Sequence, residues 1–135
     1  DWVPELNDLL SKSDFVSVHV PLGPETQNFI DQKELSAMKK DAFLINTSRG
    51  GTVNPDALRN ALNNGQIAGA ALDVTSPEPI DAQDALVHME NVLITPHIAS
   101  ASAATLRRMG LMAADNVIAL LNGESMPACL NPEVL

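Results

Sequence analysis

The chain is poor in basic residues, has one cysteine and lacks any long apolar run. Only 8 Lys and Arg stand against 17 Asp and Glu, a net charge of −9, which argues against nucleic acid or an anionic membrane as a partner. The single cysteine, Cys129, excludes an internal disulfide and a cysteine-rich metal site, so a reduced, cytoplasmic setting is expected. No apolar run approaches ~18 residues, so no transmembrane helix is expected.

The motifs of several common catalytic sites are also missing. There is no Gly-x-Ser-x-Gly elbow, no Walker phosphate loop and no Gly-x-Gly-x-x-Gly turn. No spacing of His, Cys and acidic residues is typical of a metal site, so no metal is expected. The 135 residues suffice for one domain with a core. The chain begins with Asp1 rather than Met and shows no signal peptide, so we expect a segment of a longer protein.

Apolar periodicity predicts alternating strands and helices. Strands are expected at 14–20, 42–46, 67–73 and 92–95. Helices are expected at 4–11, after a capping box of Asp31 and Glu34, after the cap Asn54-Pro55, and at 102–121. One stripe of the last helix is apolar: Leu106, Met109, Ala113, Val117 and Leu120. A proline-containing loop leads from residue 77 to the last strand, and the tail 124–135 is expected to be irregular. This alternation predicts an α/β fold with a parallel sheet and helical crossovers.

Polar clusters follow three of the expected strands directly. They are Asn46 to Gly51 (NTSRGG), Asp73 to Pro79 (DVTSPEP) and Pro96 to Ser100 (PHIAS). The carboxyl ends of parallel strands share one edge of the sheet, and ligands of open α/β sheets bind outside that edge. An arginine, a glutamate and a histidine are therefore expected to converge on one crevice.

Each candidate residue also has a simpler interpretation. Arg49 offers a planar fork that matches a carboxylate, although a single arginine is more often solvated at the surface. His97 could act as a general acid or base, or be a structural histidine. Glu78, between two prolines, could fix the imidazole ring or be a loop carboxylate in water. Asp73 could accept from an amide group or cap a turn.

The remaining polar residues are less specific. Asn46, Thr47 and Ser48 could line the same crevice or make turn hydrogen bonds. His19 is expected in a strand and His88 in a loop, both without catalytic context. From composition and spacing alone, the prediction ends at an α/β domain with a crevice.

Four segments together resemble the D-isomer-specific 2-hydroxyacid dehydrogenase family. They are 18–26 (VHVPLGPET), 43–51 (FLINTSRGG), 71–79 (ALDVTSPEP) and 94–100 (ITPHIAS), and their order and spacing match the C-terminal part of the family. The Thr-Ser-Pro-Glu-Pro segment resembles the glyoxylate/hydroxypyruvate reductase branch. The resemblance implies part of a doubly wound, Rossmann-type NAD(P)-binding domain that lacks its first half. It also implies hydride transfer between NAD(P)H and a small anionic 2-keto or 2-hydroxy acid.

The resemblance also implies roles for individual residues. Arg49 would bind the substrate carboxylate and polarise the keto oxygen, His97 would protonate that oxygen, and Glu78 would orient His97 and keep it protonated. Asp73 would contact the nicotinamide carboxamide. The cofactor-binding residues implied are Pro21, Thr47, Arg49, Asp73, His97, Ala99 and Ser100.

The 135 residues contain no counterpart of three parts of the family's proteins. These are the glycine-rich fingerprint, the residue that selects NAD or NADP, and most of the substrate domain. We therefore expect 1–121 to be the C-terminal portion of the NAD(P)-binding domain, and 122–135 to be a tail returning toward the substrate domain. Strand 14–20 would be an unpaired edge. In the family the long helix 102–121 helps to build a homodimer, which is expected for the full-length protein.

Three alternatives stay open from the sequence. The scaffold is shared with NAD(H)-binding regulatory proteins of the corepressor type, which keep the same arginine, glutamate and histidine. The chain could also be a fragment without activity of its own. Among substrates, 3-phosphoglycerate or another D-2-hydroxy acid is the alternative to glyoxylate and hydroxypyruvate.

Overall fold

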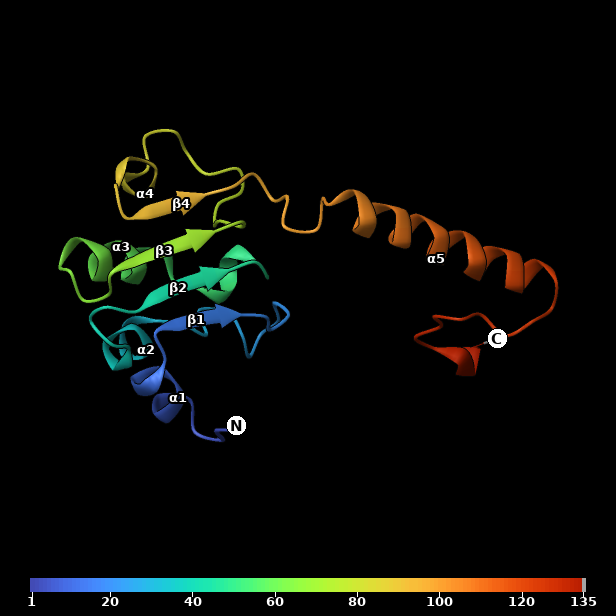
Figure 1. Ribbon diagram of the computed structural model, residues 1–135, viewed down its shortest axis with the longest axis horizontal. Coiled ribbons are helices and arrows are strands. Elements are labelled where there is room, and N and C mark those ends of the chain that lie inside the picture. Colours follow the sequence, from blue (N-terminus) through green and yellow to red (C-terminus); the bar gives the residue numbers. More distant parts are fainter. Residues whose placement is uncertain (135) are drawn as a thin grey trace. The chain divides into compact units, whose positions relative to one another are not determined.

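The computed structural model describes residues 1–134, in two compact units. The first unit, Asp1–Ile98, contains a parallel four-stranded sheet and short helices. The second unit, from Ala99 onward, contains one long helix and the C-terminal tail (Figure 1). Residue 135, the last of the expected tail, lies outside the described residues. The predicted α/β class with a parallel sheet is confirmed.

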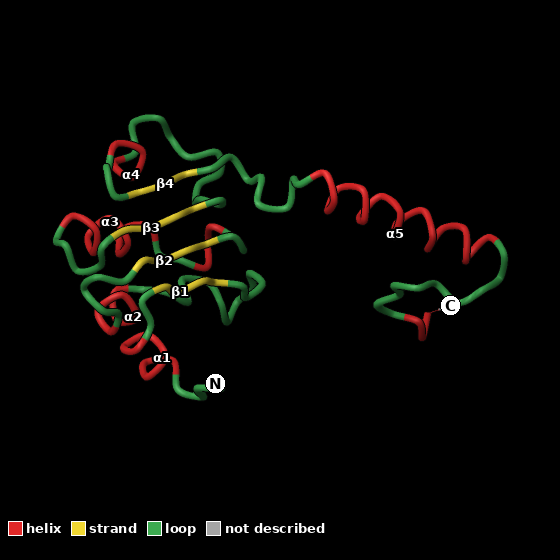
Figure 2. The backbone as a smooth tube through the Cα atoms, viewed as in Figure 1, coloured by secondary structure: helices red, strands yellow, loops and turns green. Residues whose placement is uncertain are grey.

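The sheet consists of β1 (Phe15–Val18), β2 (Phe43–Asn46), β3 (Gly69–Leu72) and β4 (Val92–Ile94). Its order is β1-β2-β3-β4 (Figure 2). Every neighbouring pair of strands is parallel. In register, Val18 lies beside Asn46, Asn46 beside Leu72, and Leu72 beside Ile94. The last residues of the four strands therefore lie side by side, and the loops that follow them emerge at one edge. β1 is an edge strand of the described sheet, as predicted.

The helices of the first unit are α1 (Leu6–Lys12), α2 (Gln32–Ala37), α3 (Pro55–Asn63) and α4 (Ala85–His88). The predicted capping box at α2 is present, with both Asp31 and Glu34 making their reciprocal bonds. The side chain of Asn54 accepts from two backbone amides at the start of α3, also as predicted. These local signals set where α2 and α3 begin between the strands.

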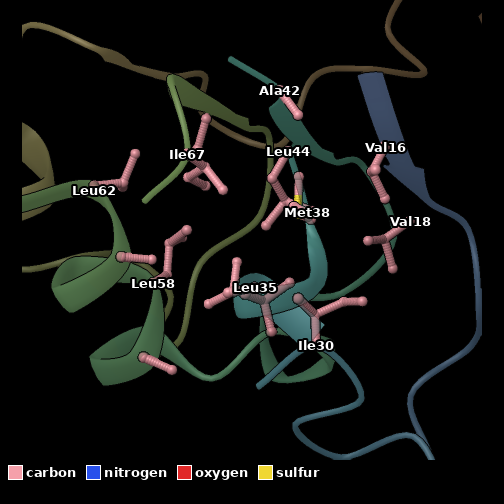
Figure 3. Close-up of a cluster of buried hydrophobic side chains, with 14 of the residues drawn as sticks. Val16, Val18, Ile30, Leu35, Met38, Ala42, Leu44, Leu58, Leu62 and Ile67 are labelled. Carbon is pink, nitrogen blue, oxygen red and sulfur yellow. The ribbon is translucent and has the colours of Figure 1, made fainter. Parts of the chain in front are cut away.

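The hydrophobic core lies on one face of the sheet (Figure 3). Alternate strand residues such as Val16, Val18 and Leu44 are buried there against Leu35 of α2 and Leu58 of α3. This alternation is the period of two that a strand with one covered face requires. The opposite face exposes apolar side chains in the described structure, namely Phe15, Phe43 and Leu93, and the first two stack with ring centroids 5.7 Å apart.

Helix α4 was not predicted, because the segment after residue 77 was expected to be a loop. It is a single turn, which is too short for an apolar period to show in sequence. It begins at a cap: the carboxylate of Asp84 accepts from the amide of Leu86. Arg59 of α3 donates to both oxygens of Asp84, with Nε 3.0 Å from Oδ1.

The ion pair between Arg59 and Asp84 shifts the pKa of both side chains. The hydrogen bond from Arg59 holds the pKa of the Asp84 carboxyl below its usual value, against the opposing effect of burial. The same hydrogen bond raises the pKa of the Arg59 guanidinium. The pair ties α3 to the start of α4, so it braces the segment that connects β3 to β4.

In the second unit, α5 (Ala103–Leu121) confirms the predicted long helix, and the Ser102 side chain caps it. The predicted apolar stripe is exposed in the described chain: Leu106, Met109, Val117 and Leu120 are each more than half exposed. Among the described residues of α5, Ala119 alone is buried.

The described tail is largely irregular, as predicted, apart from a short 3-10 turn at Pro132–Val134. The amide of Ala128 donates to the Asn116 side chain at 2.9 Å. Across the described residues, no helix combines the length and apolar character needed to cross a bilayer.

Candidate active site

His97 and Glu78 form the closest pair of titratable side chains at the carboxyl edge of the sheet. Their Nδ1 and Oε1 atoms lie 2.6 Å apart, and both side chains are about half exposed. The backbone of His97 is left-handed, with φ at 55°. Its amide donates to the carbonyls of Asp73 and Thr95, which fix that conformation. The structure therefore brings together a glutamate from the loop after β3 and a histidine from the loop after β4.

Asp73 joins the ends of β3 and β4. Its side chain is buried, and Oδ1 accepts from the Thr95 hydroxyl at 2.6 Å and the Ile98 amide at 2.8 Å. Its own amide donates to the carbonyl of Asn46 at the end of β2. A buried carboxylate is stable only when hydrogen-bonded, and these donors meet that need. Asp73 thus holds both sides of His97 in place.

Two buried residues, Asn46 and Thr52, form hydrogen bonds with the turn that carries Arg49. The carbonyl of Arg49 accepts from Asn46 Nδ2 at 3.0 Å, from Thr52 Oγ1 at 2.7 Å and from the Thr52 amide at 3.1 Å. Asn46 Oδ1 accepts in turn from the amide and hydroxyl of Ser48. Asn46 and Ser48 therefore make the turn hydrogen bonds that the sequence allowed, and Ser48 also lines a pocket beside Arg49. The Arg49 side chain is exposed and donates to the Ser48 carbonyl at 2.7 Å.

Pockets that contain the predicted site residues lie along this edge. The first is lined by Asp73, Thr75, Glu78, Pro79, Ile80, Ile94, Thr95, Pro96 and His97. The second is lined by His19, Val20, Pro21, Leu22, Ser48 and Arg49. Glu78 and His97 therefore share one pocket, while Arg49 and Pro21 share the other. The pockets thus place the histidine and the glutamate after β3 and β4, and the arginine after β2.

The other predicted ligand-binding residues are also placed. Thr47 is exposed directly after β2. Ala99 and Ser100 are exposed residues at the start of the second unit. The sequence did not single out Thr52 or Thr95, because a threonine near a strand end carries no signal of what its hydroxyl will contact.

The strand-end residues fit a nucleotide cofactor at the position where α/β sheets bind one. Asp73 presents a carboxylate at the end of β3, and the second pocket opens between the ends of β1 and β2. A glycine-rich turn for the phosphates is not among the 135 residues. In the described residues, no group of three or more metal-ligating side chains could hold a metal ion.

Comparison with known proteins gives consistent matches. A family model described as D-isomer specific 2-hydroxyacid dehydrogenase, NAD binding domain, matches residues 1–99. A glyoxylate reductase of Thermofilum pendens is 51% identical over 131 residues, which are 97% of this chain and 39% of that protein.

Solved structures agree with the sequence match. D-lactate dehydrogenase with NAD+ from Lactobacillus jensenii has a TM-score of 0.86 at 35% identity, covering 93% of this chain and 42% of that one. An NADPH-dependent glyoxylate/hydroxypyruvate reductase from Sinorhizobium meliloti, in complex with NADP and malonate, has a TM-score of 0.79 at 39% identity, covering 88% and 37%. The chain spans about two fifths of the length of the curated relatives it matches. With its parallel sheet and its His97–Glu78 pair, the chain belongs to the D-isomer-specific 2-hydroxyacid dehydrogenases, in their NAD-binding domain.

Proposed function

We propose that the intact protein containing this chain reduces small 2-keto acids such as glyoxylate or hydroxypyruvate with NADH or NADPH, and oxidises 2-hydroxy acids in reverse. The observation that carries the proposal is the 2.6 Å contact between His97 Nδ1 and Glu78 Oε1 at the carboxyl edge of the sheet. With Nδ1 engaged, Nε2 is the ring nitrogen that exchanges a proton with a substrate oxygen. Relatives named glyoxylate reductase support this substrate class.

Each residue of the proposed catalytic set has one task. His97 donates its proton to the keto oxygen as that oxygen gains negative charge, and takes it back in the reverse direction. Glu78 orients the imidazole and stabilises its protonated form. Arg49 binds the substrate carboxylate through its planar fork and polarises the carbonyl. A nicotinamide, when bound, supplies the hydride that reaches the carbonyl carbon.

The proposed cofactor site uses residues that follow all four strands. Pro21 and Thr47 line it after β1 and β2, Asp73 contacts the carboxamide, and Ala99 and Ser100 lie beside the ring; Arg49 and His97 face the same ligand. On this proposal residues 1–121 are the C-terminal portion of the NAD(P)-binding domain and 122–135 return toward the substrate domain. The phosphates are held by residues outside this chain.

We further propose that the intact protein is a cytoplasmic homodimer. Its ligands are small anionic acids, and it binds neither nucleic acid nor membrane. Support for dimerisation comes from the exposed apolar residues of α5, such as Met109 and Val117. The net charge of −9 disfavours polyanionic partners. The single cysteine suits a reducing compartment.

The test is oxidation of NADH and NADPH by the intact protein, with glyoxylate, hydroxypyruvate and other 2-keto acids, and reduction of NAD+ with 3-phosphoglycerate and other D-2-hydroxy acids. His97→Ala is expected to lower kcat by about 1,000-fold, near the middle of the range for general acid–base catalysis, with cofactor affinity kept. Cofactor binding without turnover of any of these acids would favour the regulatory, corepressor-type alternative instead.

A further inference from the structure

Gly50 is in direct backbone contact with the loop that follows β3. A Cβ at this position would lie 1.9 Å from the Thr75 carbonyl oxygen, 2.1 Å from its carbonyl carbon and 2.8 Å from the Ser76 nitrogen. The φ of Gly50 is not in the left-handed region, which among the glycines is occupied by Gly65 and Gly123. Glycine is needed here for the close approach of two backbones, and not for an unusual conformation.

The contact links the two halves of the proposed catalytic set. Gly50 directly follows Arg49, while Thr75 begins the segment that leads to Glu78. The Thr75 hydroxyl donates to the Pro77 carbonyl at 2.8 Å, which braces that segment. Glu78 then contacts His97. A displacement at Gly50 or Thr75 is therefore transmitted to the placement of Arg49 relative to His97.

We propose that Gly50, through its backbone contact with Thr75, is a positioning residue that fixes Arg49 relative to the Glu78–His97 pair. The inference rests on the proposed keto acid reduction. Because real Cβ contacts are essentially never shorter than 3.0 Å, Gly50→Ala forces one backbone or the other to move by at least about 1 Å. A misplacement of that size is enough to lower the rate of a positioned reaction by about 100-fold.

The neighbouring glycine provides a matched control. A Cβ at Gly51 would lie 3.1 Å from Gln27 Oε1 and 3.2 Å from the Leu22 methyl groups, which are the ends of flexible side chains. Gly51→Ala thus adds the same methyl group one residue further along without moving a backbone. Any effect of alanine on the flexibility of this turn is shared by the two variants.

The experiment compares both variants in the intact protein. Gly50→Ala is expected to lower kcat/KM for the keto acid by about 100-fold, while Gly51→Ala stays within about threefold of the parent. The Kd for NADH, measured by fluorescence, is expected to change by less than about threefold in both variants. Activity of Gly50→Ala equal to that of Gly51→Ala overturns the inference. An inactive parent protein instead overturns the proposed function.

Measuring the same substitution in an Arg49→Gln protein distinguishes a positioning role of Gly50 from a general loss of structure. In an Arg49→Gln protein, Gly50→Ala is expected to cost no more than about threefold further, since the pair whose geometry it disturbs is already broken. The same factor in both backgrounds would show a merely structural role and overturn the inference.

If Gly50→Ala fails to fold, Thr75→Val decides in the intact protein. Valine removes the hydroxyl bond to Pro77 and is expected to lower kcat/KM by about tenfold in the parent, but by no more than about threefold in the Arg49→Gln background. An equal factor in the two backgrounds overturns the inference.

Discussion

The hydroxyl of Thr95 donates to the buried carboxylate of Asp73 at 2.6 Å, and this bond joins the ends of β3 and β4. The carbonyl of Asp73 also accepts from the amide of His97, so the left-handed conformation of His97 depends on the same residue. The imidazole is thus placed by the sheet itself.

Thr95→Val is expected to destabilise the intact protein. The change removes one donor from a buried carboxylate while keeping the side-chain shape, and hydrogen bonds to charged groups contribute about 1.5–3 kcal/mol. Urea unfolding at neutral pH checks the free energy of unfolding. Thr95→Ser keeps the hydroxyl and is the control. Equal unfolding midpoints for the valine and serine variants would show that the bond contributes nothing.

Glu78→Gln is expected to lower kcat for keto acid reduction by about 10- to 100-fold, because an amide oxygen can orient the ring but cannot neutralise the protonated imidazole. The contact with His97 at 2.6 Å is short enough for the charge to matter. Steady-state kinetics of the intact protein measure the change. Glu90→Gln, at an exposed position after α4, is the control for loss of one negative charge. Unchanged kcat in Glu78→Gln would remove Glu78 from the catalytic set.

Sequence reasoning succeeded where local chemistry determines the outcome. The capping box of Asp31 and Glu34 and the cap at Asn54 depend on residues within one helical turn, and the structure contains both. The parallel order of the strands follows from the alternation of strands and helices. That order alone suggested that His97 and Glu78 lie on a common edge.

The sequence could not predict contacts that depend on tertiary placement. Nothing local marks Thr52 as a donor to Arg49, or Gly50 as the point where two loops touch. The single turn of α4 is too short to show a period. The stripe of α5 has the amphipathic spacing of a packed helix, but what such a stripe packs against is not encoded in the spacing.

Asn46→Asp is expected to destabilise the turn that carries Arg49. The substitution keeps the side-chain shape but places a carboxylate oxygen 3.0 Å from the Arg49 carbonyl, where Asn46 Nδ2 donates. Asn46 is 1% exposed, so an unpaired charge there is costly, and we expect a loss of about 3 kcal/mol or more at neutral pH. Thermal and urea unfolding give the value.

Ser48→Ala is the control for that variant, because it removes one donor to Asn46 Oδ1 and leaves the backbone donor in place. Its cost is expected to be about 0.5–1.5 kcal/mol. A loss in Asn46→Asp no larger than in Ser48→Ala would contradict the role of Asn46 in holding the carbonyl of Arg49.

The Arg59–Asp84 pair is expected to make stability depend on pH in the acid range. The hydrogen bond from Arg59 lowers the pKa of Asp84 from its ordinary 3.8, so the folded state holds this carboxylate ionised to lower pH than the unfolded state does. Its contribution is complete above the ordinary value and is lost as the pH falls through the lowered one. Asp84→Asn keeps a capping side chain for α4 and removes the charge, with an expected cost of about 1.5–3 kcal/mol at pH 7. Urea unfolding at several pH values measures the difference in the free energy of unfolding between parent and variant, which is expected to shrink below pH 4.

Asp56→Asn is the matched control, because Asp56 also pairs with Arg59 but its side chain is 86% exposed, where such pairs contribute about 0–1 kcal/mol. A difference for Asp84→Asn that stays constant down to pH 2 would contradict the assignment.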